Sequence, residues 1–160
     1  MERVKRIWEH KEYQKNLELI KQAEETRIFC LHNMSHFLDV ARIASIMNLE
    51  EGYGVEKEYI YAAALLHDIG RKEQYEKGIP HEEASVVIAK EILKDCNYSE
   101  EEIGMILEAI GEHGNREVMD RKDLVGLLYR ADKACRACFS CDSKDLCNWS
   151  EEKKNLTLRY

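Results

Sequence analysis

The chain contains one proline and eight glycines among 160 residues, so few positions would interrupt a helix. No apolar run approaches the roughly 20 residues that a membrane-spanning helix needs. The charged N-terminus, MERVKRIWEHKEYQ, lacks the apolar segment of a secretory signal peptide. Acidic residues outnumber basic ones, giving a formal net charge of −7, whereas binding to nucleic-acid backbones depends on excess Lys and Arg. We therefore expect a cytoplasmic protein without a membrane partner or bulk nucleic-acid binding.

The hydrophobic pattern is helical along nearly the whole chain, and no segment shows the alternation of a half-buried strand. A length of 160 residues suits one domain with a sizeable core, and no repeat or linker divides it. We predict an all-α fold of about six helices in a single domain, residues 1–160. It would have an N-terminal cover helix within 1–25, a polar loop between 70 and 80, and an irregular Cys-rich tail over 138–160. The predicted helices span residues 3–25, 31–48, 56–69, 81–93, 99–113 and 121–138.

Six histidine and aspartate residues form a pattern typical of a metal centre. In chain order they are His36, His67, Asp68, His81, His113 and Asp132. Four lie on the apolar faces of four different predicted helices: His36, His67, His113 and Asp132. A single buried histidine is usually an ordinary core residue, but a buried carboxylate without a partner is costly. Convergence on a cation explains these positions together, because imidazoles and carboxylates bind Zn, Fe, Mn, Ni or Co.

These residues lie in motifs that resemble the HD-domain phosphohydrolase superfamily. The matching segments are HFLDVARIA from His36, LLHDIGRK around His67 and Asp68, and ADK around Asp132. The likeness covers residues 30–139, and the motifs are far more specific in this order than singly. The resemblance implies an all-helical HD-type bundle with a metal ion held by these four residues.

The histidines in PHEEAS and AIGEHG resemble ligands of the two-metal subset of that superfamily. In that subset His81 and His113 would complete a second site, with Asp68 bridging the ions. The implied chemistry is hydrolysis of a phosphate ester or anhydride, often of a nucleotide, so we expect a small phosphorylated substrate. Two adjacent cations lower the pKa of a bridging water and neutralise charge on the transferring phosphoryl group. The expected cofactor is one or two divalent ions of Fe, Mn, Zn, Co or Ni.

Asp68 and Arg71 are the catalytic candidates. Arg71 lies one helical turn after His67 of the His67-Asp68 (HD) pair and is a candidate phosphate clamp. Many relatives carry Lys at this point of the motif, HDxGK. Lys72 and Lys133 are weaker candidates, because a solvated charge at a helix end is the alternative for each, and we favour that alternative for Lys72. Arg42 would either reach a phosphate or face solvent.

Four cysteines near the C-terminus have the spacing C-x2-C-x2-C-x5-C: Cys135, Cys138, Cys141 and Cys147. In a reducing compartment this density indicates a metal site rather than disulfides. The four alone would supply the thiolates of a closed site. The tail also resembles that of a bacterial subgroup of HD proteins, in which cysteines precede a Trp, as in CNWSEEKKN here.

A second possible ligand set replaces Cys135 with Cys30, and we favour it slightly. Cys30 lies six residues before His36. Cys138 likewise lies six residues after Asp132. If the two helices run antiparallel and meet at the metal, six residues carry both cysteines about 9 Å in the same direction. The ligands would then be Cys30, Cys138, Cys141 and Cys147, holding a structural Zn or an iron-sulfur cluster, with Cys135 left as a small core residue.

Two other functions fit the same residues. A non-catalytic module would bind metal or nucleotide at the HD site without turnover, and its Cys site would report redox state or metal supply. An oxidase is the third interpretation, because two-iron HD sites can also activate oxygen. His32, one turn before His36, would either support the metal ligands or approach the Cys site.

Overall fold

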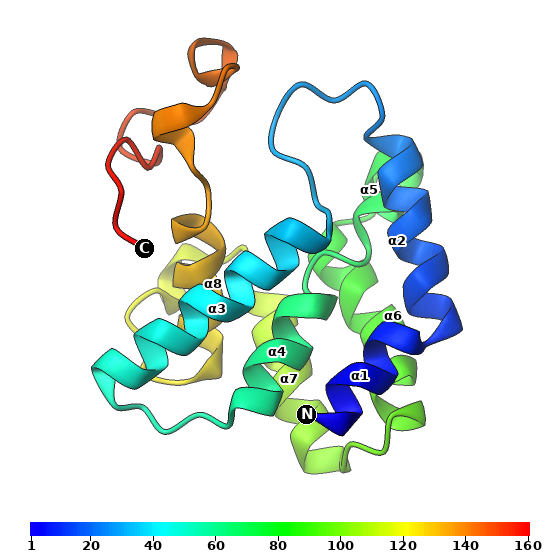
Figure 1. Cartoon of the computed structure of the whole chain (residues 1–160). Helices are drawn as coiled ribbons and strands as arrows, with labels where there is room; N and C mark the ends of the chain where they lie inside the picture. Colours follow the sequence, from blue (N-terminus) through cyan, green and yellow to red (C-terminus); the bar gives the residue numbers. More distant parts are fainter.

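Eight α-helices and three short 3₁₀ helices make up the fold (Figure 1). The structure, a computed structural model, describes residues 1–160. It contains no strand, which confirms the predicted all-α class. The α-helices are α1 (Glu2–Glu9), α2 (Lys11–Ala23), α3 (Met34–Glu51), α4 (Lys57–Leu66), α5 (Arg71–Lys77), α6 (His81–Asp95), α7 (Glu100–Glu112) and α8 (Leu124–Ala134). The 3₁₀ helices are η1 (Arg116–Val118), η2 (Cys138–Ser140) and η3 (Lys144–Leu146).

The chain forms two helices more than the six expected. The helix expected over residues 3–25 is divided at His10, whose backbone is extended (φ −68°, ψ 130°). The His10 ring accepts a hydrogen bond from the Glu12 amide at 3.2 Å, which begins α2. The segment expected as a loop between 70 and 80 contains α5, which ends at Gly78 in the left-handed conformation (φ 69°).

The apolar faces of α3, α4, α7 and α8 meet in one core. Helix α3 packs against both α4 and α8, and α7 packs against α4, α6 and α8. Burial of each large apolar side chain contributes roughly 1.5–3 kcal/mol, so this core holds firmly the helices that carry the histidine and aspartate candidates. The large side chains with almost no exposure include Phe37, Ile60, Leu66, Ile106, Ile110 and Leu127.

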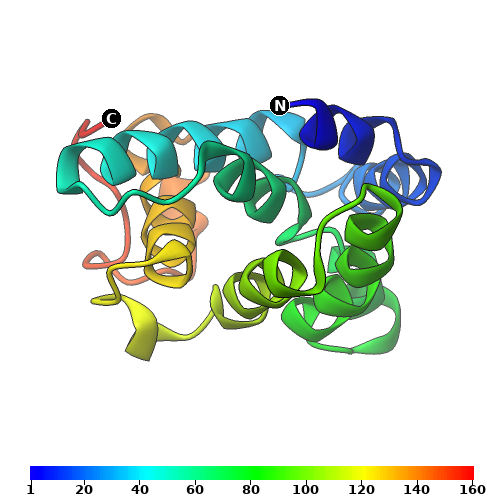
Figure 2. The ribbon, with the colours of Figure 1, turned by 90° about the horizontal axis from the view of Figure 1, so that it is seen from below.

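Helices α1 and α2 lie at one end of the molecule and the C-terminal residues at the other (Figures 1 and 2). The chain after α8 is irregular apart from η2 and η3. Asn155 ties it back, because its Nδ2 donates to Lys133 O at 2.6 Å and to Arg136 O at 2.9 Å. The tail therefore lies against the C-terminal end of α8. None of the helices has the length and apolar character needed to cross a membrane.

Side-chain caps set where two of the helices that carry the site begin. Asn33 Oδ1 accepts a hydrogen bond from the His36 amide at 3.1 Å, which starts α3 and puts His36 in its first turn. Asp123 caps α8 in the same way, by accepting from the amides of Val125 at 3.1 Å and Gly126 at 3.2 Å. These caps fix the first residues of α3 and α8, and the packing of the two helices then brings His36 and Asp132 together.

Candidate metal centre

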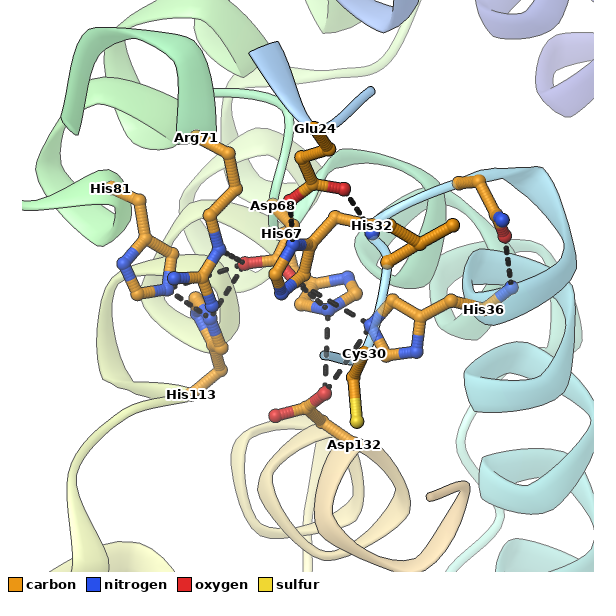
Figure 3. A network of polar contacts seen from close by, with 12 residues as sticks. Glu24, Cys30, His32, His36, His67, Asp68, Arg71, His81, His113 and Asp132 are labelled. Carbon is orange, nitrogen blue, oxygen red and sulfur yellow. Dashed lines mark hydrogen bonds and ion pairs between the residues drawn. The ribbon is translucent and has the colours of Figure 1, made fainter. Parts of the chain in front are cut away.

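The six histidine and aspartate candidates come together from five helices, and all are buried (Figure 3). His36 lies in the first turn of α3, and His67 and Asp68 directly follow α4. The other three are His81 at the start of α6, His113 just after α7, and Asp132 in the last turn of α8.

Four of the candidates form a first group, in which one ligand atom from each lies within 4.8 Å of all the others. The group consists of His36, His67, Asp68 and Asp132. Asp68 Oδ2 lies 3.1 Å from His67 Nε2 and 3.4 Å from His36 Nε2. Asp132 Oδ1 lies 3.4 Å from His36 Nε2 and 3.7 Å from His67 Nε2.

Asp68, His81 and His113 form a second group by the same measure. Asp68 Oδ1 lies 3.2 Å from His81 Nε2 and 3.6 Å from His113 Nε2. The two imidazoles face each other, with their Nε2 atoms 3.1 Å apart. Asp68 therefore turns one carboxylate oxygen to each group, and Figure 3 shows His81 and His113 on one side of Asp68 and His36 on the other.

Gly70 allows the chain after Asp68 to approach α6. A Cβ at this position would lie 2.5 Å from Ser85 N and 2.7 Å from Ala84 Cβ. The Gly70 amide also donates to Ser85 Oγ at 2.9 Å. A side chain here would separate the HD pair from His81, which explains the glycine in LLHDIGRK.

The donor set fits a metal ion. His67 Nδ1 lies 2.8 Å from Ala64 O and His113 Nδ1 lies 2.6 Å from Ile110 O. A carbonyl only accepts, so each Nδ1 is the donor, which leaves each Nε2 lone pair for a metal ion. Three buried atoms of the first group have no hydrogen-bond partner: His67 Nε2, Asp68 Oδ2 and Asp132 Oδ1. Orphaned buried acceptors are costly, and a cation among them would satisfy all three.

Comparison with protein families agrees with this geometry. The family model of the HD domain matches residues 33–137, more than half of the chain. The chain belongs to the HD-domain family. That family falls within a superfamily of metal-dependent phosphohydrolases, as the motifs indicated. The chain is also 49% identical, over the full 160 residues of both, to an uncharacterized protein of Clostridium beijerinckii. No solved structure matches it.

The two groups of histidines and aspartates together form what we call the HD centre. Burial and neighbouring charges shift the pKa values of its residues. Burial disfavours the charged form of histidine, and it lowers the pKa of His36 to about 4 and that of His81 to about 3. Burial opposes ionisation of Asp68, but the neighbouring cations outweigh it and hold its pKa well below the usual range. Burial also opposes protonation of His67, yet Asp68 and Asp132 outweigh it and raise its pKa to about 9. A dication would meet the same two carboxylates and displace that proton.

Three cationic side chains contact the aspartates of the HD centre: Arg71, Lys133 and Arg136, whose Nη2 lies 3.6 Å from Asp132 Oδ1. Arg71 Nε donates to Asp68 Oδ1 at 2.8 Å. Lys133 Nζ donates to Asp132 Oδ2 at 2.6 Å. The other cationic candidates lie elsewhere. Lys72 pairs with Glu76, and the exposed Arg42 pairs with Asp39 at 3.5 Å.

The HD centre also contains a buried pair, Glu24 and His32, of which only His32 was a candidate from the sequence. Glu24, at the end of α2, accepts from the His32 amide at 2.8 Å and pairs with His32 Nδ1. Tyr75 of α5 donates its hydroxyl to the same carboxylate. These contacts direct His32 Nε2 toward Asp68, 3.8 Å from Oδ2. Glu24 is one of several glutamates in a charged helix, so no sequence signal separates it from its neighbours.

The structure does not bring the cysteine sulfurs together as it does the HD candidates. All six cysteines are free thiols, and no three of them form a group with ligand atoms within 4.8 Å of one another. Two hydrogen bonds join the tail to the loop that carries Cys30: Ser143 Oγ to Ile28 O at 2.7 Å, and Arg136 Nη1 to Leu31 O at 3.5 Å. The four-cysteine site stays a prediction.

Cys135 was expected as a core residue if Cys30 completes the site. In the structure it is partly buried against the core. It also touches the HD centre, with its Sγ 3.2 Å from His36 Nδ1 and 3.1 Å from Asp132 O. This contact involves the ring nitrogen of His36 that does not face the aspartates. Cys135 therefore helps to orient the imidazole of His36.

Proposed function

We propose that this protein is a metal-dependent phosphohydrolase that acts on a small nucleotide or a related phosphorylated metabolite. The observation that carries the proposal is Asp68, which presents a different carboxylate oxygen to each of two histidine-bearing groups. A carboxylate shared in this way suits two ions a few ångströms apart. Bound there, the ions would lower the pKa of a water and neutralise charge on the transferring phosphoryl group.

Each residue then has a definite task. His36, His67 and Asp132 would hold one ion together with Asp68 Oδ2. His81 and His113 would hold the other together with Asp68 Oδ1. Imidazole and carboxylate ligands suit Fe, Mn, Co, Ni or Zn.

Arg71 would orient the substrate phosphate. Its Nε and Nη1 are used by Asp68 Oδ1, at 2.8 Å, and by Gln74 Oε1, at 3.1 Å. Both contacts hold the guanidinium beside the second group, and they leave its Nη2 for a phosphoryl oxygen. Charge-assisted hydrogen bonds of this kind position a phosphate and bind it more strongly than neutral ones do.

The test combines metal analysis with a substrate panel. We expect about two transition-metal ions per chain at the HD centre, and turnover of at least one nucleotide or generic phosphoester. His36→Gln should lose mainly one ion and His113→Gln mainly the other, and both should lose turnover. A fully loaded protein that hydrolyses no phosphorylated compound would contradict the proposal. If such a protein retained a bound nucleotide, the non-catalytic sensing function would be favoured instead.

We further propose that Cys30, Cys138, Cys141 and Cys147 bind a structural Zn or an iron-sulfur cluster. The hydrogen bonds between the tail and residues 28–31 support this proposal, because they bring the two cysteine-bearing segments together. Cys141→Ser should remove the zinc or iron of this site without removing the ions of the HD centre. Cys96→Ala is the matched control, since Cys96 is buried in the core away from the tail. Equal metal content in both variants would refute a metal site in the tail.

A further inference from the structure

Arg136 is a buried cation that the proposed chemistry has not yet used. It lies one turn after Asp132, and only 9% of its side chain is exposed. Its Nη2 lies 3.2 Å from His36 Nε2 and 3.6 Å from Asp132 Oδ1. Its Nε is buried without any hydrogen-bond partner. Arginine is rarely buried unless it is paired, so this guanidinium has binding capacity left for an anion.

The N–H donors that remain for an anion, Nε and Nη2, lie on one edge of the guanidinium. A nitrogen lone pair that binds a metal ion cannot also accept a hydrogen bond, so His36 as a ligand would release Arg136 Nη2. The Nε and Nη2 of an arginine form a planar fork that matches two oxygens of one phosphoryl group. The Nη1 is directed elsewhere, to Leu31 O at 3.5 Å. The fork of Arg136 therefore has its Nη2 end beside the first ligand group, and its Nε has no partner.

Arg71 approaches the centre from the other side. It contacts Asp68 Oδ1, the oxygen that faces His81 and His113, whereas Arg136 contacts the group containing His36 and Asp132. Figure 3 shows Arg71 and His81 together on the side of Asp68 away from Asp132. The two guanidinium groups thus flank the ligand cluster, one beside each group of ligands.

The charge balance at the centre favours a highly charged ligand. Two carboxylates, Asp68 and Asp132, are in contact with three permanent cations, which are Arg71, Lys133 and Arg136. Metal ions would add further positive charge. A terminal phosphate has three non-bridging oxygens and can carry two negative charges, so it can bind two metal ions and still offer an oxygen to a guanidinium. A phosphodiester has only two such oxygens and one charge.

We propose that Arg136 and Arg71 form a two-sided guanidinium clamp for terminal phosphates, which selects phosphomonoesters and polyphosphate ends over phosphodiesters. This inference rests on the proposed phosphohydrolase function and names its substrate class. Arg136 is a binding residue in it, because its fork contacts the phosphoryl oxygens directly.

The first test measures binding of inorganic phosphate to the metal-loaded full-length protein by titration calorimetry. Arg136→Gln should weaken phosphate binding by about tenfold to a hundredfold, the usual effect of losing hydrogen bonds to a charged group, while metal content per chain stays unchanged. Arg42→Gln removes the same charge from an exposed site and should bind phosphate like the wild type. Phosphate affinity within threefold of wild type in loaded Arg136→Gln would overturn the clamp.

A second variant separates charge from geometry and guards against misfolding. Arg136→Lys keeps the charge but loses the fork, so its phosphate affinity should fall between those of wild type and Arg136→Gln. If Arg136→Gln does not fold, Arg136→Lys becomes the deciding variant. A phosphate affinity of Arg136→Lys equal to that of wild type would refute two-point binding by the Arg136 guanidinium.

Kinetics with matched substrates test the selectivity. Arg136→Gln should raise KM for a phosphomonoester and change turnover of the corresponding diester much less, so that the preference between them shrinks. An equal loss for both substrates would count against the clamp. If the wild type binds metal and phosphate but hydrolyses nothing, the phosphohydrolase function fails, while weaker phosphate binding by Arg136→Gln would still support the anion site.

Discussion

Two clusters of charged residues in this protein are alike in composition but opposite in how their polar atoms are paired. The first joins α1, α4 and α7. Arg3 pairs with Glu58 and with Glu102, each at 2.7 Å, and Glu102 also accepts from the Tyr59 hydroxyl at 2.9 Å and the Ser99 amide at 2.7 Å. None of these residues has a buried side-chain atom without a partner. The second cluster is the HD centre, where three ligand atoms have none.

The contrast shows what separates a structural charge cluster from a candidate metal site. Carboxylate pKa values do not separate them, because Arg3 and other donors lower the pKa of Glu102 to about 2, and the pKa of Asp68 is also far below its usual range. Hydrogen-bond pairing does separate them. A satisfied network stabilises one packing arrangement, whereas a buried network with orphaned acceptors requires a further partner.

The largest effect should come from Asp68→Asn. Asparagine keeps the shape of Asp68 but removes the charge shared by both ligand groups, so metal content should fall at both. Loss of several kcal/mol of charge stabilisation corresponds to a loss of about a thousandfold in kcat/KM for the phosphorylated substrate. Element analysis and steady-state kinetics check this, with Asp39→Asn as a control that removes a half-exposed aspartate of α3. Full metal loading in Asp68→Asn would show that Asp68 does not join the two groups.

A smaller effect should follow from Glu24→Gln. The carboxylate of Glu24 orients His32 toward Asp68 and is held in turn by Tyr75. Mutation of a residue that orients the metal ligands without binding the metal itself typically changes metal affinity or activity by about tenfold to a hundredfold. We expect a loss in that range, measured as metal affinity by competition with a chelator and as kcat/KM. Glu25→Gln, on the exposed next residue, should leave both unchanged, and equal behaviour of the two variants would exclude a role for the Glu24-His32 pair.

The fold and the candidate ligands could be predicted from sequence for a physical reason. A helix repeats its buried face every three to four residues, so His36 and Asp132 on apolar stripes had to point into the core. The helix caps could be predicted only in part. Ser99 and Glu102 have the S-x-x-E spacing of a capping box, which the structure forms at the start of α7. The break at His10 instead depends on a ring nitrogen acting as a cap.

The residues that contact the candidate ligands could not be predicted from the sequence in the same way. Glu24 and Tyr75 reach the centre because α2 packs on α5, a tertiary contact that leaves no local pattern. Arg136 had a signal, since it follows Asp132 by four residues and would share its face in the helix predicted over 121–138. That spacing alone does not distinguish a buried guanidinium from a surface ion pair. The distance between Cys30 and the tail depends on an irregular loop, for which spacing along a helix gives no guide.

Glu102→Gln should have the smallest effect on catalysis and should act on stability instead. It weakens the contacts to Arg3, Tyr59 and Ser99, and we expect a loss of about 1–2 kcal/mol in the free energy of unfolding at pH 7, with activity per folded molecule and metal content unchanged. The folded-state pKa of Glu102, about 2, is below its ordinary value of 4.5. Its contribution is therefore fully present above pH 4.5 and is lost as the pH falls toward 2. Denaturant unfolding of wild type and Glu102→Gln between pH 7 and pH 3 should show the difference shrinking as acid is added. A difference that does not change with pH, or a loss of bound metal in Glu102→Gln, would mean that the two clusters are not independent.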